Sequence, residues 1–266
     1  MEPMLSDLIA PGLNLPGNGA PAPYQYLVLD LETSDGRADE AERELLSSWR
    51  PNPKLTPQTI GAKYLEALEK KKERLALIND APIVAVSLRS ESELRCMHCL
   101  GAAAPRAIEV EIGSPAAMVE AFATSREMLL ALRSLLDLLV AEDTLLVGHN
   151  ILGFDLRKLR WAYLRERLRL PQALAWRDQP VFDLMREYSS RLALRSDETF
   201  MVSLSTVLDG FGLPNHKSEM DGAQVPRLVS EGKVDELVAY ALRDVLAETS
   251  LFLRMAGRND DEPAAG

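Results

Sequence analysis

The chain has 266 residues, of which 47% are hydrophobic and 26% charged, so it can fill the core of one large domain or two small ones. A net charge of −10 argues against a purely electrostatic nucleic-acid binder, because such proteins are usually basic. No apolar run approaches the roughly 18 residues of a membrane span, and no secretory signal pattern is visible in residues 1–23. With Cys96 and Cys99 as the only cysteines, a disulfide framework is not indicated and a reduced, cytoplasmic setting is expected.

The first regular element is expected at residues 26–33, after a Pro- and Gly-rich segment (residues 1–23) that we interpret as a flexible lead-in. Its apolar run predicts a buried strand that ends in Asp30 and Glu32. Residues two apart on a strand point to the same face, so these carboxylates would lie side by side. Such a pair is costly to bury unless a cation sits between its members. The alternative is a strand that frays into a solvated acidic loop.

A helix is predicted from Thr56, as N-cap, and Pro57 to about residue 78. It carries a basic run, which would either reach a phosphate backbone or form a solvated helix face: Lys70, Lys71, Lys72 and Arg74.

Strands are expected at residues 82–88 and 93–100, with a further short one at 108–112. Cys96, His98 and Cys99 in the second of these do not make a zinc site, because about four ligands are needed and the chain has no second Cys/His pair. On a strand, Cys96 and His98 would share one face while Cys99 faces the other.

Next comes a capping box, with Thr124 as N-cap and Glu127 three residues later, and an amphipathic helix that ends near Val140. A strand at residues 144–147 follows directly. Strands followed by a helix and another strand predict a mixed α/β layer fold.

Two further acidic residues follow in helical contexts. Asp155 lies in the first turn of a helix that begins just after the strand at 144–147, where the helix dipole alone would favour its charge. Sites in open α/β sheets nevertheless gather at such strand ends. The last strong element is a helix at residues 234–254, on which Tyr240 and Asp244 lie one turn apart, off the apolar stripe. Alone, this pair would be interpreted as a surface pair.

Taken together, these motifs resemble one family. Asp-x-Glu at 30–32, Asn-x3-Phe-Asp at 150–155 and Tyr-x3-Asp at 240–244 are similar to the motifs of the DEDD superfamily of 3′–5′ exonucleases, in its tyrosine (DEDDy) branch. The chain most resembles the exonuclease-like domain related to the proofreading domain of family B DNA polymerases. The histidine branch would place His at position 239, which is Ala. The resemblance covers residues 24–255 but does not explain 35–80, and it implies a ribonuclease H-like α/β fold with a mixed central sheet and flanking helices.

The resemblance also implies ligands for two divalent metal ions, Mg²⁺ or Mn²⁺. Asp30 would bridge both ions, Glu32 and Asp244 would complete the first site, and Asp155 would hold the second ion, partly through water. Such ions prefer oxygen ligands. Tyr240 would orient the attacking water or, if the metal's field lowered its pKa, act as a base.

The substrate is expected to be nucleic acid with a free 3′ end, single-stranded DNA being favoured. Its terminal nucleotide would lie along the backbone of Leu31 and Thr33, with Asn150 and Phe154 placing the strand. The nearest candidates for phosphate contacts are the basic residues of one helix, which could equally form a solvated face: Arg157, Lys158, Arg160, Arg165, Arg167 and Arg169.

The leading hypothesis is therefore a metal-dependent 3′–5′ exonuclease domain at residues 24–255, followed by a disordered tail at 256–266. A 3′–5′ exoribonuclease is the alternative within the same class, and a non-catalytic nucleic-acid-binding scaffold is the alternative from another class. The chain has no room for a polymerase domain, so any polymerase or operon partner would be a separate chain. No membrane partner is expected.

Overall fold

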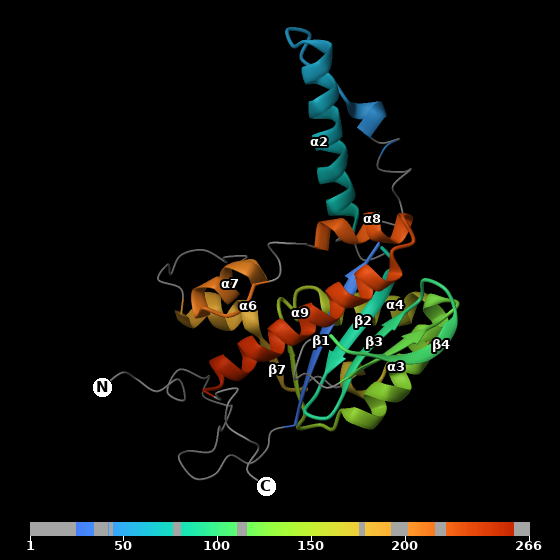
Figure 1. Ribbon diagram of the computed structural model, residues 1–266, viewed down its shortest axis with the longest axis vertical. Helices are drawn as coiled ribbons and strands as arrows, with labels where there is room; N and C mark the ends of the chain where they lie inside the picture. Colours follow the sequence, from blue (N-terminus) through green and yellow to red (C-terminus); the bar gives the residue numbers. More distant parts are fainter. Residues whose placement is uncertain are drawn as a thin grey trace.

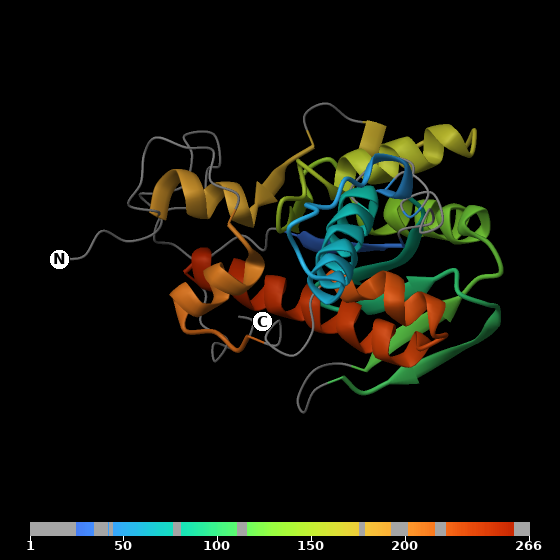
Figure 2. The ribbon, with the colours of Figure 1, turned by 90° about the horizontal axis from the view of Figure 1, so that it is seen from above.

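The computed structural model describes residues 25–34, 42, 45–76, 81–110, 116–175, 179–192, 202–215 and 222–257. Within this part of the chain, a seven-stranded sheet lies at the centre, with helices on both sides (Figures 1 and 2). The strands are β1 (Tyr26–Thr33), β2 (Ile83–Arg89), β3 (Leu94–His98), β4 (Ala103–Ile108), β5 (Ala117–Ala121), β6 (Leu145–Gly148) and β7 (Val181–Asp183). The longer helices are α2 (Pro57–Ala76), α3 (Ser125–Leu139), α4 (Asp155–Arg165), α7 (Leu204–Phe211), α8 (Val225–Ser230) and α9 (Val234–Met255). Shorter helical segments are α5 (Gln172–Ala175), α6 (Leu184–Glu187), a π-helical segment η2 (Tyr188–Leu192) and a 3₁₀ turn η4 (Gly222–Gln224).

The strand order is β4-β5-β3-β2-β1-β6-β7, so β1 lies well inside the sheet. It pairs antiparallel with β2 and parallel with β6, and β6 pairs parallel with β7. On the other side, β2 and β3 are antiparallel, β3 and β5 parallel, and β5 and β4 antiparallel. The mixed α/β sheet with flanking helices is the ribonuclease H-like arrangement expected from the motifs.

The alternation of side chains along β1 divides the core into two layers. Tyr26 and Val28 face α9 and pack with its buried residues, whereas Leu27, Leu29 and Leu31 face α3 and α4. Figure 2 shows α9 on one side of β1 and α3 and α4 on the other. Because Asp30 and Glu32 continue the even-numbered series, they point to the face that α9 covers.

Most of the long elements lie where the sequence predicted them. The predicted cap of α3 is present, with the Glu127 amide donating to Thr124 Oγ1 at 3.2 Å. The carboxylate of Glu127 accepts from the amide of Ala123 at 3.1 Å, one residue before the N-cap. The buried stripe of α9 is also confirmed; its members are Leu237, Val238, Ala241, Leu242, Val245 and Phe252.

The short strand predicted at 108–112 is wrong. The strand is β4, Ala103–Ile108, five of whose six residues are exposed. An exposed edge strand has no apolar alternation to reveal it, and Pro105 within it is tolerated because the pairing with β5 is irregular between Ala103 and Arg106. Residues 111–115 lie outside the described residues. β5, of five residues, and β7, of three, were not predicted.

Residues 45–76 stand apart from the sheet as a small helical unit. Leu45 and Leu68 form its own apolar cluster, to which Trp49 and Tyr64 contribute an edge-to-face ring contact. In Figure 1, α2 projects beyond the body of the molecule above α8. Lys70 forms an exposed ion pair with Glu66 at 2.7 Å, which is the geometry of a solvated helix face.

The expected flexible lead-in (1–23) and most of the expected tail (256–266) lie outside the described residues; only positions 256 and 257 of the tail are described. Among the described helices, none is both long and apolar enough to cross a bilayer.

Candidate active site

Three carboxylates from β1 and α9 meet at the end of the central strand. Oxygen atoms of Asp30, Glu32 and Asp244 all lie within 4.8 Å of one another. Glu32 and Asp244 are buried, and Asp30 is half-buried. The pairing of β1 with β2 shifts between Glu32 and Thr33, and such an irregularity is typical of strands that present a side chain at a site. The structure thus brings three of the four predicted acids together at this point.

Tyr240 and Asp244 lie on the face of α9 that packs against the sheet, and not on the surface, as the pair in isolation would have suggested. Their exposed fractions are 2% and 3%. Burial raises the pKa of the Tyr240 hydroxyl, as do the charges of Glu32, Asp244 and Asp30 and a hydrogen bond to the Asp244 carboxylate. The phenol therefore keeps its proton and donates a hydrogen bond to the Asp244 carboxylate.

Asp155 begins α4 and approaches the cluster from the opposite face of the sheet. It is 2% exposed. Burial is the main cause that raises the pKa of its carboxyl, and the negative charge of Asp30 raises it further. Backbone amides of Asp155 itself and of Leu31 act in the opposite direction. Within the described chain, Asp155 Oδ1 has no hydrogen-bond donor.

The loop before α4 is held by Asp183, at the end of β7, which sequence reasoning missed. Asp183 is 3% exposed and accepts hydrogen bonds from the amides of Asn150 (3.2 Å) and Leu152 (3.1 Å), while also capping α6. Asn150 has φ 60, a left-handed conformation that Asn tolerates better than most residues. A Cβ on Gly153 would lie 2.1 Å from Asn150 Oδ1, so any other residue there would displace the Asn150 side chain.

Glu248 is a fifth acid in this region that sequence reasoning also missed. It is 2% exposed, and its Oε1 accepts from the amide of His149 at 3.2 Å. Burial is the main cause that raises the pKa of its carboxyl, and the negative charges of Asp30, Asp155 and Asp244 raise it further. The signal was present: Tyr240, Asp244 and Glu248 are spaced four apart and thus share one helix face.

This donor set fits divalent metal ions that prefer oxygen. Several acids are packed at one point with little solvent, an arrangement that mutual repulsion and desolvation oppose unless a cation compensates. Among the buried carboxylate oxygens of the described residues, Asp155 Oδ1 and Glu248 Oε2 have no hydrogen-bond donor. Hard cations such as Mg²⁺ and Mn²⁺ take such oxygens as ligands. The acidic cluster can therefore bind metal.

The residues expected to place a substrate strand surround this cluster. Leu31 is 4% and Thr33 8% exposed, so little of either residue is open to solvent. Phe154 is half-buried, and the Lys158 ammonium lies 5.8 Å from its ring centroid. Asn150 is likewise half-buried.

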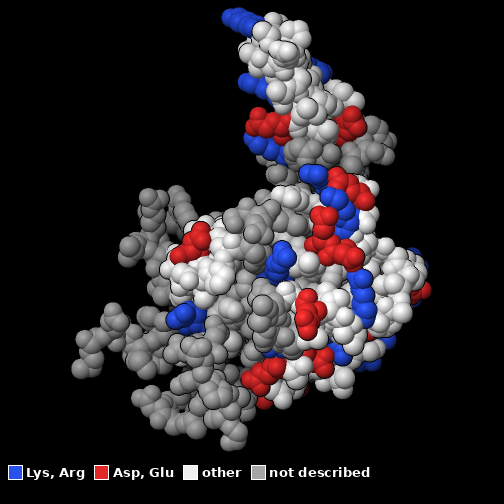
Figure 3. Space-filling view, in the orientation of Figure 1, with Lys and Arg blue, Asp and Glu red and all other residues white. Residues whose placement is uncertain are grey.

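The basic helix needs one correction. Lys158 is 2% exposed and packs under Phe154, so it is not part of a solvent-facing basic surface. Arg160 is half-buried and its Nε donates to the Leu174 carbonyl at 3.0 Å. The remaining arginines of the group are exposed: Arg157, Arg165, Arg167 and Arg169. On the face seen in Figure 3, the described basic and acidic side chains are interspersed, without gathering into one basic stripe.

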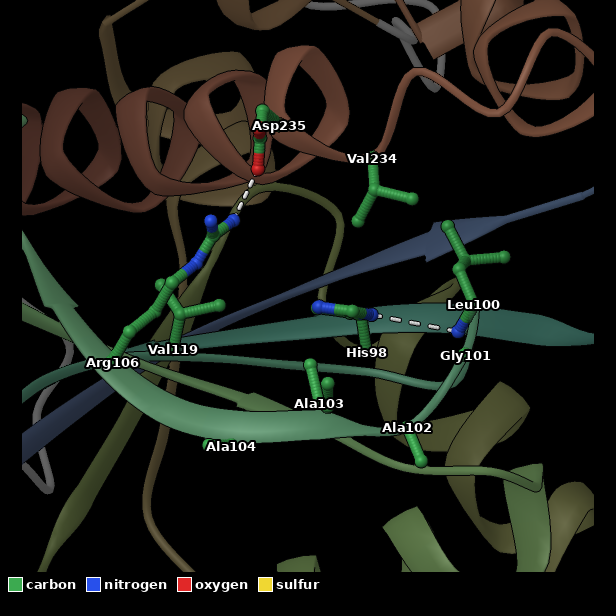
Figure 4. Close-up of a pocket in the computed structure, with 11 residues that line it drawn as sticks. His98, Leu100, Gly101, Ala102, Ala103, Ala104, Arg106, Val119, Val234 and Asp235 are labelled. Atoms are coloured by element: carbon green, nitrogen blue, oxygen red, sulfur yellow. Dashed lines mark hydrogen bonds and ion pairs between the residues drawn. The ribbon is translucent and has the colours of Figure 1, made fainter.

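A separate cavity of about 300 Å³ lies between the β3–β5–β4 edge and the start of α9 (Figure 4). Its walls are mostly apolar, and Arg106 and Asp235 form an ion pair at its side. The His98 ring accepts at Nδ1 from the Leu100 amide at 3.4 Å. Cys96 packs in the core on the α9 side and Cys99 against the opposite core, so the faces predicted for this strand are confirmed.

Comparison with protein families now adds an independent observation. Residues 119–261, more than half of the chain, match the model of a family described as a predicted 3′–5′ exonuclease related to the exonuclease domain of PolB. The chain belongs to this family. Membership supports exonuclease activity, the hydrolysis of nucleic acid from a 3′ end. A comparison with curated proteins found no match.

The exonuclease-family match and the geometry cover different parts of the site. The matched residues include Asp155, Tyr240 and Asp244 but begin after β1, so Asp30 and Glu32 lie outside them. These two residues join the site through the fold, which brings β1 against α9.

Proposed function

We propose that the protein is a metal-dependent 3′–5′ exonuclease of the DEDDy type that removes nucleoside monophosphates from single-stranded DNA. The observation that supports this most strongly is the meeting of Asp30, Glu32 and Asp244 within 4.8 Å, in a chain of an exonuclease family. The charge of Asp30 raises the pKa of Asp155, and the charges of Glu32, Asp244 and Asp30 raise that of Tyr240, which supports assigning both residues to the same site.

Asp30 would be shared by two divalent ions, with Glu32 and Asp244 completing one site and Asp155 contributing to the other. When bound, two such ions would lower the pKa of an attacking water and stabilise charge on the attacking and leaving oxygens of a phosphodiester. The chain's own contribution is to hold these carboxylates together in a buried pocket, where their attraction for divalent cations is stronger than in water.

Tyr240 is proposed to orient the attacking water through a hydrogen bond at its hydroxyl. Its raised pKa keeps the proton on the phenol, which favours the orienting role over that of a base. The hydrogen bond to Asp244, one turn away on α9, fixes the direction of the hydroxyl.

The 3′-terminal nucleotide would lie along the backbone of β1 at Leu31 and Thr33, with Asn150 and Phe154 on its other side. A half-buried aromatic ring with a cation beneath it can stack on a base or sugar. Relation to the PolB exonuclease domain favours DNA, and an exoribonuclease remains the alternative within this class. We propose a polymerase or operon component as a partner, and a cytoplasmic location.

The test is a digestion ladder of 5′-labelled single- and double-stranded DNA and RNA with Mg²⁺, Mn²⁺ or EDTA. We expect progressive shortening of single-stranded DNA from its 3′ end, dependent on metal and absent in Asp30→Ala. Digestion by Asp30→Ala at the parental rate would refute the metal assignment. Binding of DNA without any shortening would instead favour the non-catalytic scaffold.

A further inference from the structure

The helical unit of residues 45–76, which we call the arm, is inserted at the end of the sheet that carries the acidic cluster. It lies between β1 and β2 in the chain, and β1 pairs with β2 as far as Thr33, the residue after Glu32. The amide of Ser34 then donates to the Pro82 carbonyl at 3.0 Å, so the two strands are still together where the connection leaves them. The segment that contains the arm therefore leaves and rejoins the sheet beside Glu32.

The inner end of α2 stays near the acidic cluster, because few residues join it to the sheet. Positions 76 and 81 are five residues apart, a length of chain that spans at most about 18 Å. α2 itself has 20 residues and is about 30 Å long. In Figure 1, its other end and the loop before it lie furthest from the sheet. The arm thus extends outward from the site by a length that about nine nucleotides would cover at a spacing of about 3.4 Å.

The outer part of the arm is basic in a chain that is acidic as a whole. Residues 45–65 contain Arg50, Lys54 and Lys63 and no aspartate or glutamate, whereas the net charge of the chain is −10. All three cations are exposed, and Figure 3 shows basic side chains without acidic ones at the outer end of the arm. Nearer the sheet, residues 66–76 mix acidic and basic types. A basic region on an acidic protein marks the part that a polyanion such as nucleic acid can approach.

The arm has its own contacts that hold this outer part in place. The rings of Trp49 and Tyr64 meet edge to face, with their centroids 5.5 Å apart, and join the segment before the loop to α2. In the loop, the amide of Lys54 donates to Asn52 Oδ1 at 3.0 Å, and Thr56 caps the start of α2. A surface that is ordered before its ligand arrives loses less conformational entropy on binding.

We propose that the arm binds the phosphate backbone of the substrate strand, on the 5′ side of the nucleotide held at the acidic cluster, through Arg50, Lys54 and Lys63. This inference rests on the proposed function, since it takes the bound strand to be the one that is shortened. Nucleic acid is favoured over an acidic protein as the partner, because the arm rises from the edge at which the strand end would be held. Phosphate contacts of this kind position a strand without selecting its sequence.

The first measurement is the fluorescence anisotropy of a labelled single strand, of about 20 nucleotides, with the full chain in EDTA, which prevents digestion of the strand. Each phosphate contact on a single strand contributes about 0.7 to the slope of log K against log salt, or roughly fivefold in affinity at 0.1 M salt. Lys54→Gln and Lys63→Gln should therefore each bind about fivefold more weakly, with a slope smaller by about 0.7. Arg254→Gln, which removes an exposed cation in the last turn of α9, is the matched control and should bind like the parent.

The second measurement separates the holding of the strand from the chemistry. With Mn²⁺ present, Lys54→Gln and Lys63→Gln should each raise KM for the long strand about fivefold and leave kcat unchanged, because they remove binding that is equal in the ground and transition states. A dinucleotide held at the acidic cluster is too short to reach the outer part of the arm, so its KM and kcat should match those of the parent.

Parental affinity and parental salt slope in both lysine variants would overturn the inference, would leave the proposed function intact and would favour an acidic protein as the partner of the arm. An equal loss of affinity in Arg254→Gln would also overturn it, because the effect would then come from net charge alone. A parent that binds the long strand but digests neither substrate would overturn the proposed function. The anisotropy of the lysine variants would then still decide whether the arm binds the strand.

Discussion

Replacing Tyr240 by phenylalanine removes one hydroxyl from the proposed site and nothing else. That hydroxyl is buried and hydrogen-bonded to the Asp244 carboxylate. A hydrogen bond involving a charged group contributes about 1.5–3 kcal/mol. If the Tyr240 hydroxyl contributes a hydrogen bond of this strength in the transition state, its loss raises the activation free energy by the same amount. Each 1.4 kcal/mol or so of activation free energy lowers a rate tenfold, so kcat should fall roughly 10- to 150-fold. Single-turnover digestion of a 5′-labelled single strand at saturating Mn²⁺ measures this directly.

Tyr163→Phe is the matched control. Tyr163 is also fully buried, and its hydroxyl donates to the Leu129 carbonyl at 2.7 Å, but it lies in the core on the α3 side of the sheet. Its loss should cost about 1 kcal/mol of stability, or about 2–4 °C in Tm for a chain of this size, without lowering the rate.

The pH dependence separates an orienting hydroxyl from a base. Because its pKa is raised, Tyr240 stays protonated across the neutral range, so Tyr240→Phe should lower the rate equally at each pH and keep the parental profile. A parental rate in Tyr240→Phe would refute the reasoning, and so would loss of a basic limb from the parental pH profile.

Three further changes test other parts of the site. Asp30→Asn should lower activity by roughly 10³-fold, since several kcal/mol of transition-state stabilisation would be lost, and a rate within tenfold of the parent would contradict this. Gly153→Ala should lower the free energy of unfolding by about 1–3 kcal/mol and reduce activity, because the new Cβ would meet Asn150 Oδ1 at 2.1 Å. Gly61→Ala is the control and should not destabilise the protein, because its new Cβ would have nothing within 4 Å. Burial raises the pKa of the Asp155 carboxyl, so the unfolded chain loses this proton at a lower pH than the folded chain does. In EDTA, the free energy of unfolding of the parent, relative to that of Asp155→Asn, should therefore fall as the pH rises from about 4 through the raised pKa. A rise of this relative stability over the same pH range would contradict the reasoning.

The long elements and the acids on them could be predicted because each carries a local signal. The apolar run before Asp30 and Glu32 predicted β1, and the Thr124 cap predicted the start of α3. Their convergence followed from the family motifs and not from any local pattern. The periodicity of α9 gave its buried stripe but left Tyr240 and Asp244 looking like surface residues.

The residues that were missed act through partners far away in sequence. Asp183 holds amides some thirty positions earlier, and Glu248 accepts from the amide of His149, 99 residues away. Neither contact has a sequence signal of its own. β4 was misplaced for a related reason: its exposed side chains carry no alternation, and its position is fixed by pairing with β5.

The central claim is that carboxylates from β1, α4 and α9 together bind a pair of cations. Anomalous diffraction from crystals soaked in Mn²⁺ tests it most directly. We predict two peaks about 3.5–4 Å apart, with Asp30 between them, Glu32 and Asp244 beside one, and Asp155 beside the other. Anomalous peaks confined to other acidic residues, with this cluster left empty at saturating Mn²⁺, would contradict the claim.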